Sequence, residues 1–201
     1  MPSMFARDLR TGPNLLSLSR IVLVLAAAPL YLYVSHALGM VLATVAAVTD
    51  FFDGALARAT GQVTRLGEIL DQFGDLCFES LLLLLAVSQG FLPAVVLFVY
   101  LFREFWVTSV RRFMAGAGRN LPPSPWGKLK TNLLMWGFLP TYLSLSGALP
   151  ALEPYLGLMG RVAIGLGLLA SYLGAAGYTR AFIAAYGEAQ AASGAQGTRT
   201  G

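Results

Sequence analysis

Four aspartates stand at helical intervals within one short segment of a chain that is otherwise poor in acid. They are Asp50, Asp53, Asp71 and Asp75. Four carboxylates around one site would repel one another strongly without bound cations, and their hard oxygens suit Mg²⁺ or Mn²⁺. These ions commonly also take the phosphate oxygens of a substrate. The spacing therefore predicts a divalent-metal site.

Two neighbouring helices would bring these carboxylates together. At about 100° per residue, Asp50 and Asp53 share one broad helical face. The same face includes three further residues, namely Gly54, Ala57 and Arg58. Asp71 and Asp75 are four residues apart, so they also lie on one face, with Gly67 one turn before them. A short turn between the two segments makes the helices antiparallel, and the small residues let helices or a ligand come close.

The elements that must position these residues are apolar helices. The chain has 201 residues, of which 56% are hydrophobic and 12% charged. A membrane span needs about 20 mainly apolar residues. Six such segments are predicted, at residues 15–34, 38–58, 67–88, 91–111, 128–147 and 156–184. We therefore expect an all-α integral membrane protein with six transmembrane helices in one domain, residues 1–187, and a polar, disordered tail at 188–201.

The positive charges are distributed as expected for a membrane protein rather than for a nucleic-acid-binding protein. Lysine and arginine favour the cytoplasmic side of a membrane. They cluster before the first span and in the loops after the second and fourth spans, so both termini are expected in the cytoplasm, as in a multi-pass protein of the inner membrane. The carboxylates then lie in a polar cavity that opens to the cytoplasm. These cations can also attract anionic membrane lipids.

The acidic segment resembles a known family signature. The chain is similar to the CDP-alcohol phosphotransferase family through the pattern Asp50-x2-Asp53-Gly54-x2-Ala57-Arg58-x8-Gly67-x3-Asp71-x3-Asp75. For that family the resemblance implies that an alcohol attacks the β-phosphorus of a CDP-linked substrate and that CMP leaves. It also implies a homodimer.

The resemblance assigns roles to the motif residues. It implies two Mg²⁺ or Mn²⁺ ions, with ligands Asp50, Asp53, Asp71 and Asp75. Asp75 is also the implied general base, which accepts the hydroxyl proton of the alcohol. The residues implied to shape the CDP pocket are Gly54, Ala57, Arg58 and Gly67.

Two further stretches resemble the phosphatidylglycerophosphate synthase branch of the family, which couples CDP-diacylglycerol to glycerol 3-phosphate. One runs from Pro13-Asn14 to Arg20, and the other joins Arg103-Glu104 to a Gly127-Lys128 segment. An anionic acceptor needs cations, and arginine binds phosphate through two parallel hydrogen bonds. The candidates for the acceptor phosphate are Arg103, Arg111, Arg112, Lys128 and Lys130, with Arg20 a weaker one. A purely structural pairing of Arg103 with Glu104 is the alternative for that arginine.

One departure from the branch leaves the acceptor open. The branch usually has a proline and a lysine around the last two aspartates, where this chain has Gln72 and Leu76. The same chemistry with inositol, inositol phosphate, serine or phosphatidylglycerol as acceptor is therefore an alternative.

Two other classes compete with a transferase. A divalent-metal transporter would also carry intramembrane acids, but these acids lie at one end only and no internal repeat suggests alternating access. A non-catalytic scaffold would leave the aspartate pattern unexplained. The glycines of the last span, such as Gly160 and Gly167, are expected to serve close helix packing or dimerisation.

Overall fold

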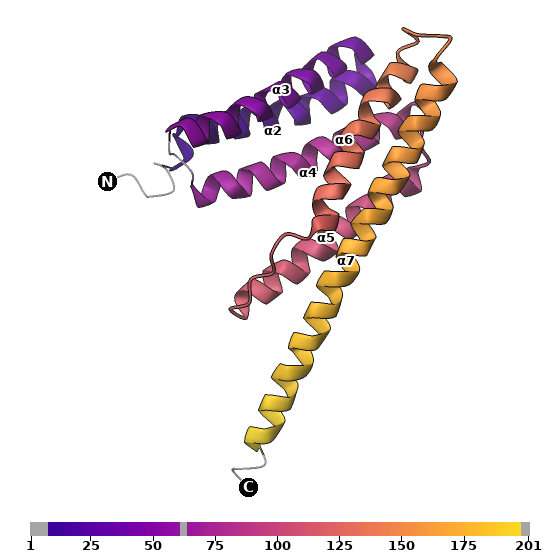
Figure 1. Ribbon diagram of the computed structural model, residues 1–201. Coiled ribbons are helices and arrows are strands. Elements are labelled where there is room, and N and C mark those ends of the chain that lie inside the picture. The colour runs from indigo at the N-terminus through magenta and orange to yellow at the C-terminus, as the bar shows by residue number, and fades with distance from the viewer. Residues whose placement is uncertain (1–7, 61–63, 198–201) are drawn as a thin grey trace. The chain divides into compact units, whose positions relative to one another are not determined.

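The computed structural model is all-helical in the part of the chain that it describes, residues 8–60 and 64–197, with side chains described outside 50–60 and 189–197. Figure 1 shows its helices. They are α2 (Gly12–Tyr33), α3 (His36–Thr60), α4 (Arg65–Ser88), α5 (Ala94–Gly116), α6 (Pro125–Leu145) and α7 (Glu153–Gly197). Each of the six predicted segments overlaps one of these helices, so the all-α prediction is confirmed.

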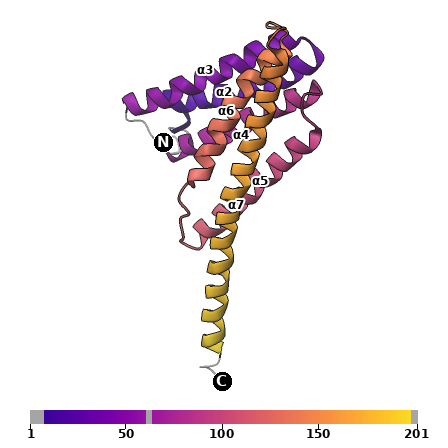
Figure 2. The ribbon, with the colours of Figure 1, turned by 45° about the vertical axis from the view of Figure 1, so that its right-hand side comes forward.

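The chain divides into two compact units, residues 1–97 and 98–201. In the first unit α2 packs against both α3 and α4. Figures 1 and 2 show α2 and α3 side by side. In the second unit α6 and α7 pack along each other. The remainder of α5, from Phe98 onward, also belongs to the second unit.

Two of the described helices are long and apolar enough to cross a membrane. They are α2 and the Glu153–Glu188 part of α7, and His36–Thr49 is a shorter apolar stretch. Charged residues interrupt the apolar sequence of α4 and α5, as Asp71 and Arg103 illustrate. Composition thus supports a membrane protein, whereas six crossings and a cytoplasmic cavity stay predictions.

The buried face of α2 is polar near the start of the helix and apolar toward its end. The buried polar side chains that α2 contributes to the first unit therefore lie near its start. The helix begins with proline in its first turn, where the missing N–H costs nothing. Its buried residues recur every three or four positions, as expected for a helix with one buried face. They are Pro13, Asn14, Ser17, Arg20, Ile21, Val24, Ala27 and Tyr31.

Helix α4 begins with a side-chain cap. The Thr64 hydroxyl accepts a hydrogen bond from the backbone N–H of Gly67 at 3.0 Å, which satisfies one otherwise unpaired donor of the first turn. Glu68 in the same turn adds a negative charge at the positive end of the helix dipole. After α4 the backbone of Gly90 adopts φ +70°, a conformation that favours glycine.

Close contact between α6 and α7 depends on glycine. A Cβ at Gly160 would lie 3.1 Å from the backbone nitrogen of Thr141, and one at Gly167 would lie 3.2 Å from the Leu134 side chain. The packing role expected for these two glycines is confirmed. Gly165 and Gly177 have no such neighbour within 4 Å among the described atoms.

The structure differs from the prediction at the C-terminal end. Helix α7 continues to Gly197, whereas residues 188–201 were expected to form a disordered tail. Residues 188–196 contain four alanines, two glutamines and one glutamate, and all three residue types favour helix. Residues 198–201 lie outside the described part.

Candidate functional site

The predicted metal and CDP residues fall on two helices of the first unit. Five of them are in the last part of α3, where the backbone is helical as predicted, but their side chains lie outside the described residues: Asp50, Asp53, Gly54, Ala57 and Arg58. The other three, Gly67, Asp71 and Asp75, lie on α4. The side chains of these three residues are within the described part of the chain.

An arginine from α2 binds both described aspartates. The Nη1 of Arg20 donates to Oδ1 of Asp75 at 3.2 Å, and its Nη2 lies 3.4 Å from Oδ1 of Asp71. The same Nη2 donates to the backbone oxygen of Asp71 at 2.9 Å. Arg20 is 1% exposed. We name the group formed by Arg20, Asp71, Gly74 and Asp75 the carboxylate cluster.

Gly74 makes room for this arginine. A Cβ at Gly74 would lie 2.7 Å from Nε and 2.8 Å from Cζ of Arg20, closer than real Cβ contacts. The guanidinium therefore lies directly against the backbone of α4, between the two aspartates. No other residue type would leave this space, because every other side chain begins with a Cβ.

A second polar contact joins α2 to α4 at the helix start. The Asn14 side chain, 1% exposed, donates to the hydroxyl of Thr64 at 2.9 Å and to the backbone oxygen of Asp8 at 2.8 Å. A Cβ at Gly67 would lie 2.6 Å from Oδ1 of Asn14. Helix packing thus gives Gly67 a structural reason to be glycine, whereas its predicted contact with CDP stays a prediction.

The chemistry of Asp71 and Asp75 fits a divalent ion. Their side chains are 56% and 50% exposed, so the carboxylates reach solvent while Arg20 lies beneath them. Carboxylate oxygens are the ligands that Mg²⁺ and Mn²⁺ prefer. Among the described side chains no group of three or more potential ligands forms. Because the Asp50 and Asp53 side chains are outside that part, the four-carboxylate site stays a prediction.

Two of the predicted acceptor cations meet in the second unit. Oε1 of Glu104 accepts from Nη1 of Arg103 at 2.7 Å and from Nζ of Lys130 at 3.1 Å. Both cations are buried, and Nζ of Lys130 also lies 5.5 Å from the centre of the Tyr100 ring. The expected alternative, an Arg103–Glu104 pairing, is therefore present. The other three candidates are less buried: Arg111, Arg112 and Lys128.

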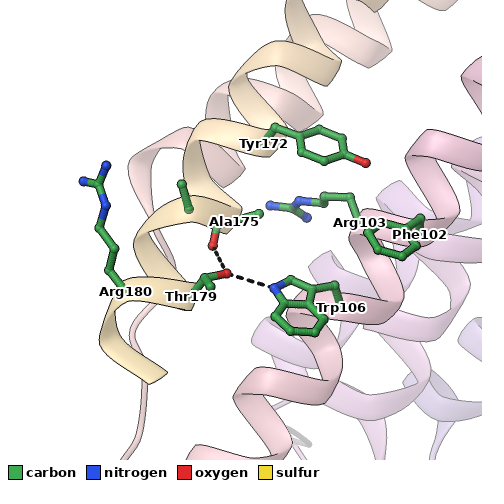
Figure 3. Close-up of a pocket in the computed structure, with 8 residues that line it drawn as sticks. Phe102, Arg103, Trp106, Tyr172, Ala175, Thr179 and Arg180 are labelled. Carbon is green, nitrogen blue, oxygen red and sulfur yellow. Dashed lines mark hydrogen bonds between the residues drawn. The ribbon is translucent and has the colours of Figure 1, made fainter. Parts of the chain in front are cut away.

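Arg103 also lines a cavity between α5 and α7. The cavity has a volume of about 530 Å³, and its walls are mainly aromatic and apolar, including Phe102, Trp106 and Tyr172. Figure 3 shows the Arg103 side chain reaching toward α7, and Arg180 of α7 also lines the cavity. The Nε of Arg103 donates to the backbone oxygen of Ser171 at 3.0 Å. This arginine is thus fixed between two helices of the second unit.

Hydrogen bonds hold the wall of the cavity. The indole Nε1 of Trp106 donates to the Thr179 hydroxyl at 2.8 Å, and that hydroxyl donates to the backbone oxygen of Ala175 at 2.9 Å (Figure 3). The Tyr172 hydroxyl donates to the backbone oxygen of Val99 at 2.8 Å. The polar atoms of the wall are therefore turned toward the helices, which leaves the cavity a mainly apolar surface.

Sequence reasoning missed the partners of Arg20. It ranked this residue as a weak candidate for the acceptor phosphate, whereas the structure places it against Asp71 and Asp75. The available signal was the spacing of Asn14, Ser17 and Arg20, which puts three polar residues on one face of an apolar helix. That spacing indicates a polar contact with another helix, although it does not say which one.

The family model described as CDP-alcohol phosphatidyltransferase matches residues 10–173. Curated relatives are named CDP-diacylglycerol–glycerol-3-phosphate 3-phosphatidyltransferase. The protein of Bacillus subtilis (strain 168) is 37% identical over 98 residues, which are 49% of this chain and 51% of the relative. That of Rickettsia typhi is 32% identical over 127 residues, 61% of this chain and 71% of the relative. That of Aquifex aeolicus is 36% identical over 125 residues, 59% and 68% of the two chains.

The matched segment contains every candidate site residue, from Asp50 to Lys130. The chain spans about half the length of the Bacillus relative and about 70% of the Rickettsia one.

Proposed function

We propose, because this chain belongs to the CDP-alcohol phosphatidyltransferase family, that it transfers the phosphatidyl group of CDP-diacylglycerol to glycerol 3-phosphate and releases CMP. The observation that carries the proposal is the spacing of the motif aspartates within the matched segment, with Asp71 and Asp75 on one face of α4. The names of the relatives support the choice of glycerol 3-phosphate as acceptor.

The reaction needs one bond to form and one to break. A hydroxyl oxygen of glycerol 3-phosphate bonds to the β-phosphorus of CDP-diacylglycerol, and the bond from that phosphorus to the bridging oxygen breaks. The bridging oxygen leaves with CMP. The hydroxyl proton passes to the carboxylate of Asp75, which is half exposed and can reach an incoming alcohol.

The four aspartates would hold Mg²⁺ or Mn²⁺, and the geometry of Asp71 and Asp75 supports this for the α4 half of the site. When bound, the ions would neutralise the charge that develops on the pyrophosphate oxygens. Gly54, Ala57 and Arg58 are proposed to shape the CDP pocket beside them.

The acceptor phosphate is proposed to bind to the cations of the second unit. Arg103 and Lys130 already share Glu104, so their positions are fixed before any anion arrives. Lys128 is exposed near the start of α6, where the first-turn N–H groups also favour an anion. Arg111 and Arg112 lie near the end of α5 and are further candidates.

The setting of the enzyme is also a proposal. All six helices are proposed to cross the inner membrane, with both termini and the carboxylates at the cytoplasmic side. The many exposed large apolar side chains, among them Leu25, Phe98 and Leu166, support contact with membrane lipids. A homodimer is proposed from the family resemblance.

The test is CMP release by the detergent-purified full chain. CDP-diacylglycerol and Mg²⁺ are supplied with glycerol 3-phosphate, inositol, inositol phosphate, serine or phosphatidylglycerol in separate reactions. Release that requires glycerol 3-phosphate and stops on chelation supports the proposal. Release with another acceptor would retain the chemistry and reject this acceptor, and no release from folded protein would reject the transferase function.

A further inference from the structure

In the carboxylate cluster, Arg20 contacts two aspartate side chains as well as joining α2 to α4. Its guanidinium contacts Asp71 and Asp75 on either side of Gly74, through separate nitrogens. A planar guanidinium holds its donors in a fixed fork, so two carboxylates bound to it are held in a fixed relation to each other. A lysine ammonium would supply the charge without this fork.

The arginine itself is firmly held. It is 1% exposed, and its Nη2 donates to the backbone oxygen of Asp71 as well as facing the carboxylate. The backbone bond ties the guanidinium to α4 independently of either side chain. The Asp71 and Asp75 side chains, by contrast, are half exposed, and their contact with Arg20 limits the rotamers that they can adopt.

We propose that Arg20 is a positioning residue for the phosphotransfer, which fixes the carboxylates of Asp71 and Asp75 in the orientation that binds metal and accepts the proton. Groups that orient metal ligands from behind are often as important as the ligands themselves. The role requires Gly74, because only a residue without Cβ admits the guanidinium. This inference rests on the proposed function of the same site.

Two variants that conserve charge test it. Arg20→Lys keeps the positive charge and removes the fork. Gly74→Ala keeps every charged group and displaces the guanidinium, and since the atoms that must move are the end of a long side chain, the helices can remain packed. The matched controls are Arg119→Gln, in an exposed ion pair with Glu188, and Gly177→Ala, with no neighbour within 4 Å in the described part.

The measurements are kcat, the KM for CDP-diacylglycerol, Mn²⁺ affinity by electron paramagnetic resonance, and the thermal unfolding midpoint of the detergent-purified full chain. We expect both variants to lose about 10- to 100-fold in kcat and about tenfold in Mn²⁺ affinity. The KM for CDP-diacylglycerol should change far less, and both controls should stay within about twofold of the unmodified protein.

A solely structural role predicts a different result. Wild-type kcat and Mn²⁺ affinity in both variants, with or without a lower unfolding midpoint, would overturn the proposal, as would complete activity in Arg20→Lys. If the unmodified chain releases no CMP with any acceptor, the proposed function fails. The Mn²⁺ measurement still tests the role of Arg20 in that case.

Discussion

Each aspartate of the carboxylate cluster has two environments. One side of Asp75 faces the buried guanidinium of Arg20 and the other faces solvent, where substrate and metal would arrive. An acid held in this way keeps its contact with the arginine and still presents an oxygen to solvent. The proposed roles of Asp75 as metal ligand and base both need this exposed side of the carboxylate.

Asp75→Asn should lower kcat by about 10²- to 10⁴-fold, since an amide cannot accept the hydroxyl proton. Binding of CDP-diacylglycerol should persist, because the other motif residues remain. Turnover is measured as CMP release, and binding by competition with a labelled substrate. The matched control is Glu68→Gln, an exposed acid in the first turn of α4. Wild-type turnover in Asp75→Asn would reject the base.

Lys128→Ala should raise the KM for glycerol 3-phosphate by about tenfold, the cost of one lost charge-assisted hydrogen bond. The KM for CDP-diacylglycerol should change much less. Arg119→Ala, at an exposed position in an ion pair with Glu188, is the control. Initial rates measured over a range of concentrations of both substrates give the two KM values. An unchanged KM for glycerol 3-phosphate would count against the phosphate-binding role of Lys128.

At the scale of elements, the helices were predictable because their signals are local. The predicted segment 67–88 corresponds to α4, Arg65–Ser88, since its apolar run is bounded by polar residues at both ends. The pairing of Arg20 with acids 51 and 55 positions later was not predictable. It depends on which face of α2 packs on α4, and one sequence contains no local signal for that choice.

The α6–α7 pair offers a direct test of helix packing. Gly160→Ala should lower the free energy of unfolding by about 1–3 kcal/mol, because its Cβ would press on Thr141. Gly165→Ala is the control on the same helix, and with open space at that position it should be neutral or slightly stabilising. Thermal unfolding in detergent measures both. Equal midpoints for the two variants would contradict this account of the packing.

At the scale of the whole molecule, the chain consists of a unit that carries the motif aspartates and a unit that carries the cations proposed to bind the acceptor. The composition of residues 188–201 was a poor guide to their structure. A polar segment that is rich in alanine can extend a helix as well as form a disordered end, and α7 continues to Gly197. The order of the described helices α2 to α7 followed from hydropathy, whereas the contacts within each unit required the structure.

A chain that ends after residue 187 should retain turnover within about twofold. The truncation removes the contact of Glu188 with Arg119, and an ion pair that exposed contributes at most about 1 kcal/mol. The measurement is CMP release, together with the unfolding midpoint. A large loss of activity in well-folded truncated protein would show that the end of α7 serves the reaction.

The two polar contacts between α2 and α4 set an angle as well as a distance. Asn14 holds the start of α4 through Thr64, and Arg20, six residues further along α2, holds it beside Gly74. A helix held at one point can still roll about its own axis, whereas a helix held at two cannot. The interval between Asn14 and Arg20 therefore sets the direction in which Asp71 and Asp75 face. A single residue inserted into that interval would turn the two contacts about 100° apart, and α4 could then satisfy only one of them.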